Sequence, residues 1–214
     1  MPEIASRLHA ENISIVLKEA LEKSQVKLEE IDAFAVTRGP GLIGALQVGL
    51  QAAKTLAALY GKPLIPVHHL AAHIYANEYV KPLIFPCLAI VVSGGNTELV
   101  IMKNHLEFEI IGETKDDAVG ECYDKVARVL GLPYPGGIPI DALSKKGQAT
   151  YKLPRPLHDH SFDFSYSGLK TSIINMVHTA EQKGEKIVIE DLCRSFQETA
   201  IGMILDKSLR AVEH

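Results

Sequence analysis

Three histidines in the eight-residue segment PVHHLAAH, residues 66–73, are the first feature of the sequence that could do chemistry. On a helix, residues i and i+4 lie about 40° apart around the axis, so His69 and His73 can point the same way, while His68 precedes the helix or faces elsewhere. Two such imidazoles can share a divalent metal, although zinc or iron needs at least a third ligand. Alternatively, His69 caps or packs at a helix start and His73 hydrogen-bonds locally. The segment lacks the Glu of HExxH, so it offers no metalloprotease base.

A glycine turn follows an apolar run in VVSGGNTEL, residues 91–99. Successive backbone N–H groups of such a turn can wrap a phosphate, and Asn96 and Thr97 could add side-chain donors. The same letters also suit an ordinary tight hairpin, in which glycine only supplies a positive φ. Taken alone, the pattern favours the hairpin.

Two carboxylates bracket a proline–glycine loop in ECYDKVARVLGLPYPGGIPID, residues 121–141. Asp124 and Asp141 could accept hydrogen bonds from sugar hydroxyls. The alternative pairs Asp124 with Arg128 one helical turn along, and makes Asp141 a helix N-terminal residue favoured by the helix dipole.

Hydroxyls and an ammonium alternate with aromatic residues in SFDFSYSGLKT, residues 161–171. Ser165, Ser167 and Lys170 could bind an anion there. The segment could equally be a loop anchored by its aromatic side chains, with Ser167 as the N-cap of the following helix.

The composition is that of a globular chain large enough to bury a core, with 214 residues of which 47% are hydrophobic. No apolar run is long enough to span a bilayer, and the N-terminal letters lack the regions of a signal peptide, so we expect no membrane association and a cytoplasmic protein. The three cysteines are far apart and suggest neither a disulfide framework nor a cysteine zinc site.

The net charge of the chain is −4, whereas proteins that bind nucleic acid with their own surface are usually basic. If RNA is a ligand, part of the positive surface must come from a partner or a local patch.

The expected elements place these residues on an α/β framework. Short apolar strands at 31–37 and 63–67 alternate with helices, which favours a mostly parallel sheet. Two apolar runs around SGGN then predict a hairpin, and FEIIGE continues that sheet. The last third reads as mainly helical, with helices at roughly 167–182 and 189–213.

Six segments occur in an order that resembles a known family: PEIASRLHAE, AVTRGPGLIGALQVG, HHLAAH, VSGGNTEL, ECYDKVARVLGLPYPGG and SFDFSYSGLKT. The chain is similar to the bacterial tRNA N6-adenosine threonylcarbamoyltransferases, once described as O-sialoglycoprotein endopeptidases. The resemblance runs from residue 2 to near the C-terminus.

The resemblance implies an α/β fold of the actin-like ATPase type (hexokinase-type, ASKHA), with two lobes around a nucleotide cleft. Residues 1–90 would form part of the first lobe, including the metal-histidine helix, and residues 91–214 part of the second lobe, with the substrate loop and a helical insertion. The implied reaction transfers the threonylcarbamoyl group from threonylcarbamoyl-AMP to N6 of adenosine 37, in tRNAs reading codons that begin with A.

The resemblance also implies site residues. His69 and His73 match two ligands of one divalent metal, with iron (Fe²⁺) as the first choice and zinc as the second. The positions that match substrate contacts are Val92, Ser93, Gly94, Gly95, Asn96, Asp124, Gly137 and Asp141. His9 and Glu11 are candidates for proton transfer, and no side chain is assigned as the general base.

The implied partners are tRNA, threonylcarbamoyl-AMP, the shorter paralogous dimer partner and the small ATPase of the bacterial complex. Family members carry a strand and phosphate-binding turn before PEIASR, and a later Asp–Asn–Gly segment with the third metal ligand, an aspartate. Neither is found in this sequence, so we expect a truncated chain that is unstable or inactive alone. Two alternatives are a non-catalytic dimerisation scaffold of the same complex and a metal-dependent endopeptidase, for which no nucleophile signature is found.

Overall fold

The computed structural model describes residues 2–213, which divide into two compact units between Leu83 and Ile84. The boundary between the units differs from the expected one between residues 90 and 91, which would cut strand β3 (Cys87–Val92). Because β3 pairs along its whole length with β4 (Thr97–Asn104), it belongs with the second unit.

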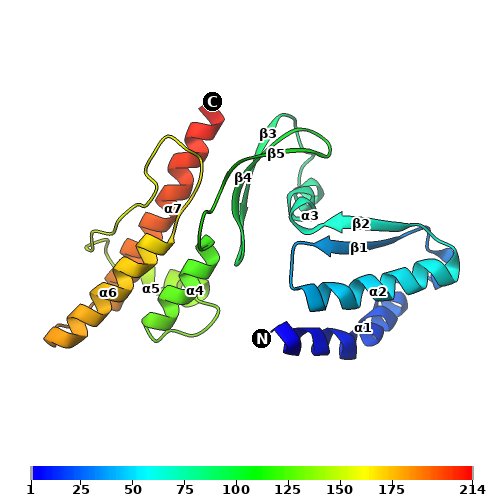
Figure 1. Cartoon of the computed structure of the whole chain (residues 1–214), viewed down its shortest axis with the longest axis horizontal. Coiled ribbons are helices and arrows are strands. Elements are labelled where there is room, and N and C mark those ends of the chain that lie inside the picture. The colour runs from blue at the N-terminus through cyan, green and yellow to red at the C-terminus, as the bar shows by residue number, and fades with distance from the viewer. Residues whose placement is uncertain (1, 214) are drawn as a thin grey trace. The chain divides into compact units, whose positions relative to one another are not determined.

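The first unit is a three-layer arrangement in which α2 lies between α1 and a pair of parallel strands (Figure 1). Its elements are α1 (Pro2–Ser24), a 3-10 turn (Leu28–Glu30), β1 (Phe34–Gly39), α2 (Ile43–Tyr60), β2 (Leu64–His68), α3 (His69–Tyr75) and a second 3-10 turn (Ala76–Tyr79). Helix α2 ends where Gly61 adopts φ +61°, and the Gly61 N–H bonds to Ala57 O. Glycine takes this left-handed conformation without steric cost, which explains the stop.

The second unit begins with an antiparallel sheet in the order β3–β4–β5, with β5 at Glu107–Glu113. The predicted parallel pairing is confirmed for β1 and β2 in the first unit. The predicted hairpin around SGGN and its continuation by FEIIGE are confirmed in the second unit, where β3, β4 and β5 pair antiparallel. The physical reason is the length of the connections. Residues 93–96 and 105–106 are too few for the crossover that a parallel pair requires, so they form hairpins.

Helices make up the rest of the second unit, as the sequence predicted for the last third. They are α4 (Val119–Val129), α5 (Gly137–Ser144), α6 (Ser167–Lys183) and α7 (Ile189–Glu213). Helix α4 contacts α5 and α6, and α7 contacts α5 and β3. Their inner faces enclose a core with several fully buried residues, among them Leu99, Val126, Phe164, Tyr166 and Phe196. The α/β class is thus confirmed.

Within residues 2–213, no helix is both long enough and apolar enough to cross a membrane.

Candidate functional site

The two histidines at i and i+4 lie together on the exposed face of α3. Leu70 and Ile74 form the buried face of this short helix, which turns His69 and His73 outward. Their Nε2 atoms are 3.3 Å apart, which is a hydrogen bond, so the alternative of a local hydrogen bond for His73 is confirmed. The two rings meet edge to face with centroids 4.5 Å apart. The predicted separation from His68 is confirmed, because His68 is the N-cap and its Nδ1 accepts a hydrogen bond from the Ala71 N–H at 3.5 Å.

The spacing of the two nitrogens suits a shared metal ion. Two ligands of tetrahedral zinc at about 2.0–2.1 Å from the ion lie roughly 3.3–3.4 Å apart, which agrees with the Nε2–Nε2 distance of 3.3 Å. Nevertheless, residues 2–213 contain no group of three or more His, Cys, Asp or Glu side chains arranged to hold a metal. His69 and His73 therefore fit two positions of a coordination shell and leave the others to water or further ligands.

His9 and Glu11 lie on the exposed surface of α1, in the same unit as the histidine pair. The imidazole Nδ1 of His9 bonds to the backbone oxygen of Ala5 one helical turn earlier, at 2.7 Å. This local contact gives no support to either residue as a proton-transfer group.

The glycine segment between β3 and β4 forms a turn that is organised by Ser93. The Ser93 Oγ accepts hydrogen bonds from the backbone N–H groups of Gly95 (3.3 Å) and Asn96 (3.0 Å). The Ser93 N–H donates to Asn96 O at 2.9 Å, which closes the turn. Gly94 and Gly95 are exposed, and an added Cβ on either would meet no atom within 4 Å. Open space therefore surrounds the tip of the turn, where Val92 is also exposed.

Helix α4 begins directly against this turn. A Cβ on Gly120 would lie 2.5 Å from Ser93 O and 2.8 Å from Gly94 Cα, so only glycine permits the contact. The Val119 N–H donates to Oγ1 of the buried Thr97 at 2.9 Å, which ties the helix start to β4. The positive end of the α4 dipole is thus placed beside the glycine turn, an arrangement that favours an anion there.

One turn further along α4, the Asp124 side chain holds the loop that leads into α5. Its Oδ1 accepts the Gly136 N–H at 2.7 Å, and a Cβ on Gly136 would meet Tyr123 O at 2.6 Å. The alternative ion pair with Arg128 is not formed. Gly137, the first residue of α5, has open space where a Cβ would lie. Asp124 and Gly137 are therefore brought together at one end of the loop.

Asp141 lies in the second half of α5 rather than at its N-terminus, so the dipole explanation for this residue is wrong. Its carboxylate accepts hydrogen bonds from Lys145 at 2.6 Å and Gln197 at 3.1 Å. These bonds, with that from Lys145 the larger effect, hold the pKa of Asp141 below its usual value. Both oxygens already have partners, so a ligand hydroxyl would have to share or replace one of them.

Of the two interpretations of residues 161–171, the structure supports the loop anchored by aromatic side chains, because Phe164 and Tyr166 are fully buried. Ser167 is the first residue of α6 and not its N-cap. The capping acceptor is Asp116, which accepts from the backbone N–H groups of Tyr166 at 2.7 Å and Ser167 at 3.2 Å.

Asp116 and Asp117 are the residues that sequence reasoning missed. Asp117 bonds to Lys125 on α4 and Lys170 on α6, each at 2.6 Å. Burial of Asp117 opposes its ionisation, but the hydrogen bonds from the two lysines outweigh that effect and lower its pKa. The available signal in the sequence was a pair of adjacent carboxylates just before a predicted helix, a pattern typical of helix-start contacts. Asp117 ties α4 to α6, whereas Asp116 holds the start of α6.

Comparison with known proteins identifies the family of the chain. The family described as tRNA N6-adenosine threonylcarbamoyltransferase matches residues 1–214. A curated relative of that name from Staphylococcus carnosus is 55% identical over 214 residues, covering 100% of this chain and 62% of its own. The corresponding protein from Bacillus licheniformis is 57% identical over 214 residues, covering 100% of this chain and 63% of its own.

A solved structure from Pseudomonas aeruginosa, an uncharacterized protein with similarity to the peptidase YEAZ, is 17% identical, with a TM-score of 0.38 over 86% of this chain and 82% of that chain. That likeness is too weak to bear on the site. The chain spans about 62% of the length of the curated relatives it matches. With its whole length matched and more than half of its residues identical to theirs, the chain belongs to the tRNA N6-adenosine threonylcarbamoyltransferase family.

Proposed function

We propose that this chain is the part of a threonylcarbamoyltransferase that binds threonylcarbamoyl-AMP and presents it to N6 of adenosine 37 in tRNAs reading codons that begin with A. The observation that carries the proposal is the packing of the Ser93–Asn96 turn on the first turn of α4. Exposed backbone around Gly94 and Gly95 beside a helix N-terminus suits the phosphate of an adenylate. Asp124 and Gly137, at the loop before α5, suit its nucleoside.

In the proposed reaction, adenine N6 attacks the carbamoyl carbon of the mixed anhydride. A new C–N bond forms, the C–O bond to the phosphate breaks, and AMP leaves with that electron pair while N6 loses a proton. Because the exocyclic amine is a poor nucleophile, positioning should supply much of the acceleration. His9 and Glu11 remain candidates for the proton only by resemblance.

The histidine pair is the proposed metal site. His69 and His73 would hold one divalent ion, iron by resemblance or zinc, that acts as a Lewis acid on a carbamoyl or phosphate oxygen. The distance of 3.3 Å between the two Nε2 atoms supports this assignment. The proposal also includes the actin-like two-lobed fold, a cytoplasmic location where tRNA is found, and the paralogous dimer partner and small ATPase as partners.

Binding of a non-hydrolysable threonylcarbamoyl-AMP analogue, measured by calorimetry on the 214-residue chain, tests the proposal. We expect saturable binding that is weakened about tenfold or more by Asp124→Ala and retained in Asp32→Ala, an exposed aspartate of the first unit. Transfer to unmodified tRNA is then followed by mass spectrometry of the released nucleosides. A folded chain that does not bind the analogue would contradict the proposal.

A second candidate function is a non-catalytic scaffold in the same tRNA-modification complex. It is favoured by the fact that only two metal ligands come together among residues 2–213. Metal content discriminates between the two functions: equal, negligible iron and zinc in the wild type and in His69→Ala/His73→Ala would support the scaffold.

A further inference from the structure

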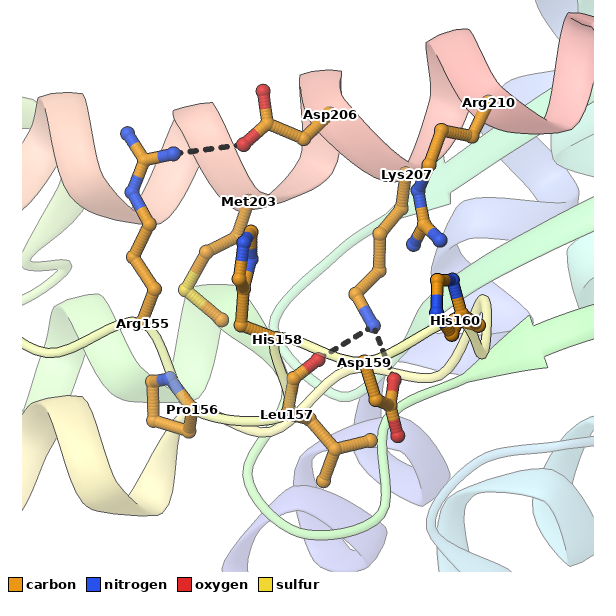
Figure 2. Close-up of a pocket in the computed structure, with 10 residues that line it drawn as sticks. All are labelled: Arg155, Pro156, Leu157, His158, Asp159, His160, Met203, Asp206, Lys207 and Arg210. Carbon is orange, nitrogen blue, oxygen red and sulfur yellow. Dashed lines mark hydrogen bonds and ion pairs between the residues drawn. The ribbon is translucent and has the colours of Figure 1, made fainter.

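A pocket separate from the proposed adenylate site lies between residues 155–160 and the C-terminal half of α7 (Figure 2). Its volume of about 390 Å³ is within the range of small-ligand sites, roughly 300–1,000 Å³. The glycine turn, Asp124 and Asp141 do not line it. The pocket is therefore a distinct cavity of the second unit for which the proposed reaction has no use.

The wall of the pocket is held in place by a buried lysine. Lys207 is only 4% exposed, and its Nζ donates to Leu157 O at 2.9 Å and to Ser161 O at 3.1 Å. The Asp159 carboxylate lies 3.6 Å from the same nitrogen. Figure 2 shows Lys207 reaching from α7 to the loop. These bonds fix the loop on the helix, so the pocket does not depend on a ligand to form.

The charges of the pocket leave one end positive. Arg155 pairs with Asp206 at 2.7 Å, and Lys207 faces Asp159, so these four charges largely cancel. Arg210 at the other end has no carboxylate within ion-pair distance in the described part of the chain. Its guanidinium instead donates to a backbone carbonyl at 2.9 Å. An anion would therefore find its best position beside Arg210.

Two imidazoles line the same pocket without partners of their own. His158 and His160 are exposed, and neither side chain makes a hydrogen bond or ion pair with another residue of the range 2–213. Figure 2 shows His160 below Arg210 and His158 beside Met203. A planar ring next to an apolar floor is a stacking surface for a base, and an imidazole next to a guanidinium is a donor pair for a phosphate. The floor is apolar because it consists of Pro156, Leu157 and Met203.

We propose that this pocket binds one nucleotide of a single-stranded RNA segment. The phosphate would lie at Arg210 and His160, and the base would stack on His158 above the apolar floor. Single-stranded RNA is recognised in this way, by stacking of unpaired bases combined with positive charge along the backbone. The inference rests on the proposed function, in which the acceptor is an RNA.

The surrounding sequence supports an RNA strand over a free nucleotide. Residues 145–160 carry four Lys or Arg and one Asp, in a chain whose net charge is −4. Lys145 is paired with Asp141 and Arg155 with Asp206, which leaves Lys146 and Lys152 without an ion pair among the described residues. These two lysines precede the pocket in the sequence and can contact a phosphate backbone beyond one nucleotide.

The test uses the full chain and a fluorescently labelled RNA hairpin with a single-stranded loop, with binding measured by anisotropy. The variant His158→Ala/His160→Ala should fold normally, since neither side chain has an intramolecular partner, and should bind about tenfold more weakly, as stacking losses predict. Arg210→Gln should make the slope of log K against log salt concentration shallower by about 1, the change expected for the loss of one phosphate contact. His178→Ala, an exposed histidine on α6, is the matched control and should bind like the wild type.

Three results would overturn the inference. The double variant could bind the RNA hairpin as tightly as His178→Ala does, or blunt duplex RNA could compete for the wild type as well as the hairpin does. The third is a double variant that loses binding of free AMP but keeps its affinity for the hairpin. The adenylate-analogue titration separates this inference from the proposed function. The double variant should bind the analogue as well as the wild type does. If the wild type does not bind the analogue and the RNA result holds, the adenylate proposal fails and the RNA pocket stands.

Discussion

The carboxylate of Asp124 accepts a hydrogen bond from the backbone N–H of Gly136, 2.7 Å away. This bond joins helix α4 to the loop that precedes α5, and so it sets the position of Gly137, the first residue of that helix. It means that a residue proposed to contact the adenylate also shapes the wall on which the adenylate would lie. Loss of the side chain should then affect both stability and binding.

The variants Asp124→Ala and Asp124→Asn separate these effects. Asp124→Ala leaves the Gly136 N–H without its acceptor and should lower the free energy of unfolding by about 1–3 kcal/mol. Asp124→Asn keeps an acceptor oxygen and should restore most of that stability, but not the full affinity for the adenylate analogue. Urea unfolding and calorimetry on the same preparations measure the two quantities. Equal stability of all three proteins would show that the bond to Gly136 has no structural role.

The contact between Gly120 and the glycine turn gives a steric prediction. Gly120→Ala places a Cβ 2.5 Å from Ser93 O, so the helix and the turn must separate. We expect a destabilisation of about 1–3 kcal/mol, as for overpacking of a well-packed site, together with weaker analogue binding. Gly137→Ala is the matched control for stability, because a Cβ there meets no atom within 4 Å. Thermal unfolding that ranks the two variants equally would contradict the close packing of α4 on the turn.

The histidine pair predicts weak but specific metal binding. With two imidazoles and no third ligand in residues 2–213, Zn²⁺ or Fe²⁺ should bind the purified chain less tightly than it binds a complete site. His69→Ala and His73→Ala should each remove most of this binding, since one imidazole cannot chelate, whereas His178→Ala should not. Calorimetric titration under anaerobic conditions measures the affinities. Unchanged metal binding in both single variants would place the ion elsewhere.

Asp117 predicts a pH dependence of stability. Its pKa in the folded protein lies below the unfolded value of 3.8, because the hydrogen bonds from Lys125 and Lys170 outweigh its burial. A carboxyl group with a lowered folded pKa stabilises the fold above its unfolded pKa, and that contribution disappears as the pH falls through the folded pKa. The free energy of unfolding should therefore decline below about pH 4.

The Asp117→Asn variant isolates this term. At neutral pH it should be less stable by about 1–3 kcal/mol, the range for hydrogen bonds to a charged group. Its stability should also fall less steeply in acid than that of the wild type. Asp32→Asn, at an exposed position of the first unit, should leave the pH profile unchanged. Parallel profiles for the wild type and Asp117→Asn would refute this role for the carboxylate.

Local sequence signals predicted the long helices well. Apolar periodicity and turn residues gave 167–182 and 189–213, and the structure has α6 at Ser167–Lys183 and α7 at Ile189–Glu213. The geometry of the histidine pair followed from helical spacing alone. These features depend on residues close in the chain, which is why they could be read from the sequence.

Features that depend on distant partners could not be read in the same way. Asp116 caps a helix that begins some 50 residues later, so its role requires the tertiary fold. The start of α5 was missed because the proline and glycines before Asp141 suggested a loop. Pro139 is in fact compatible with the first turn of that helix, where an N–H would have no intrahelical acceptor.

The parallel pair in the first unit has a consequence for handling the protein. In the described range, β1 and β2 pair only with each other, so each has an outer row of peptide groups without a ladder partner. Such rows are templates for adding a strand from another molecule. Concentrated solutions of the chain should therefore self-associate through the first unit. Dilution should reverse this association and leave the fold of the second unit unchanged.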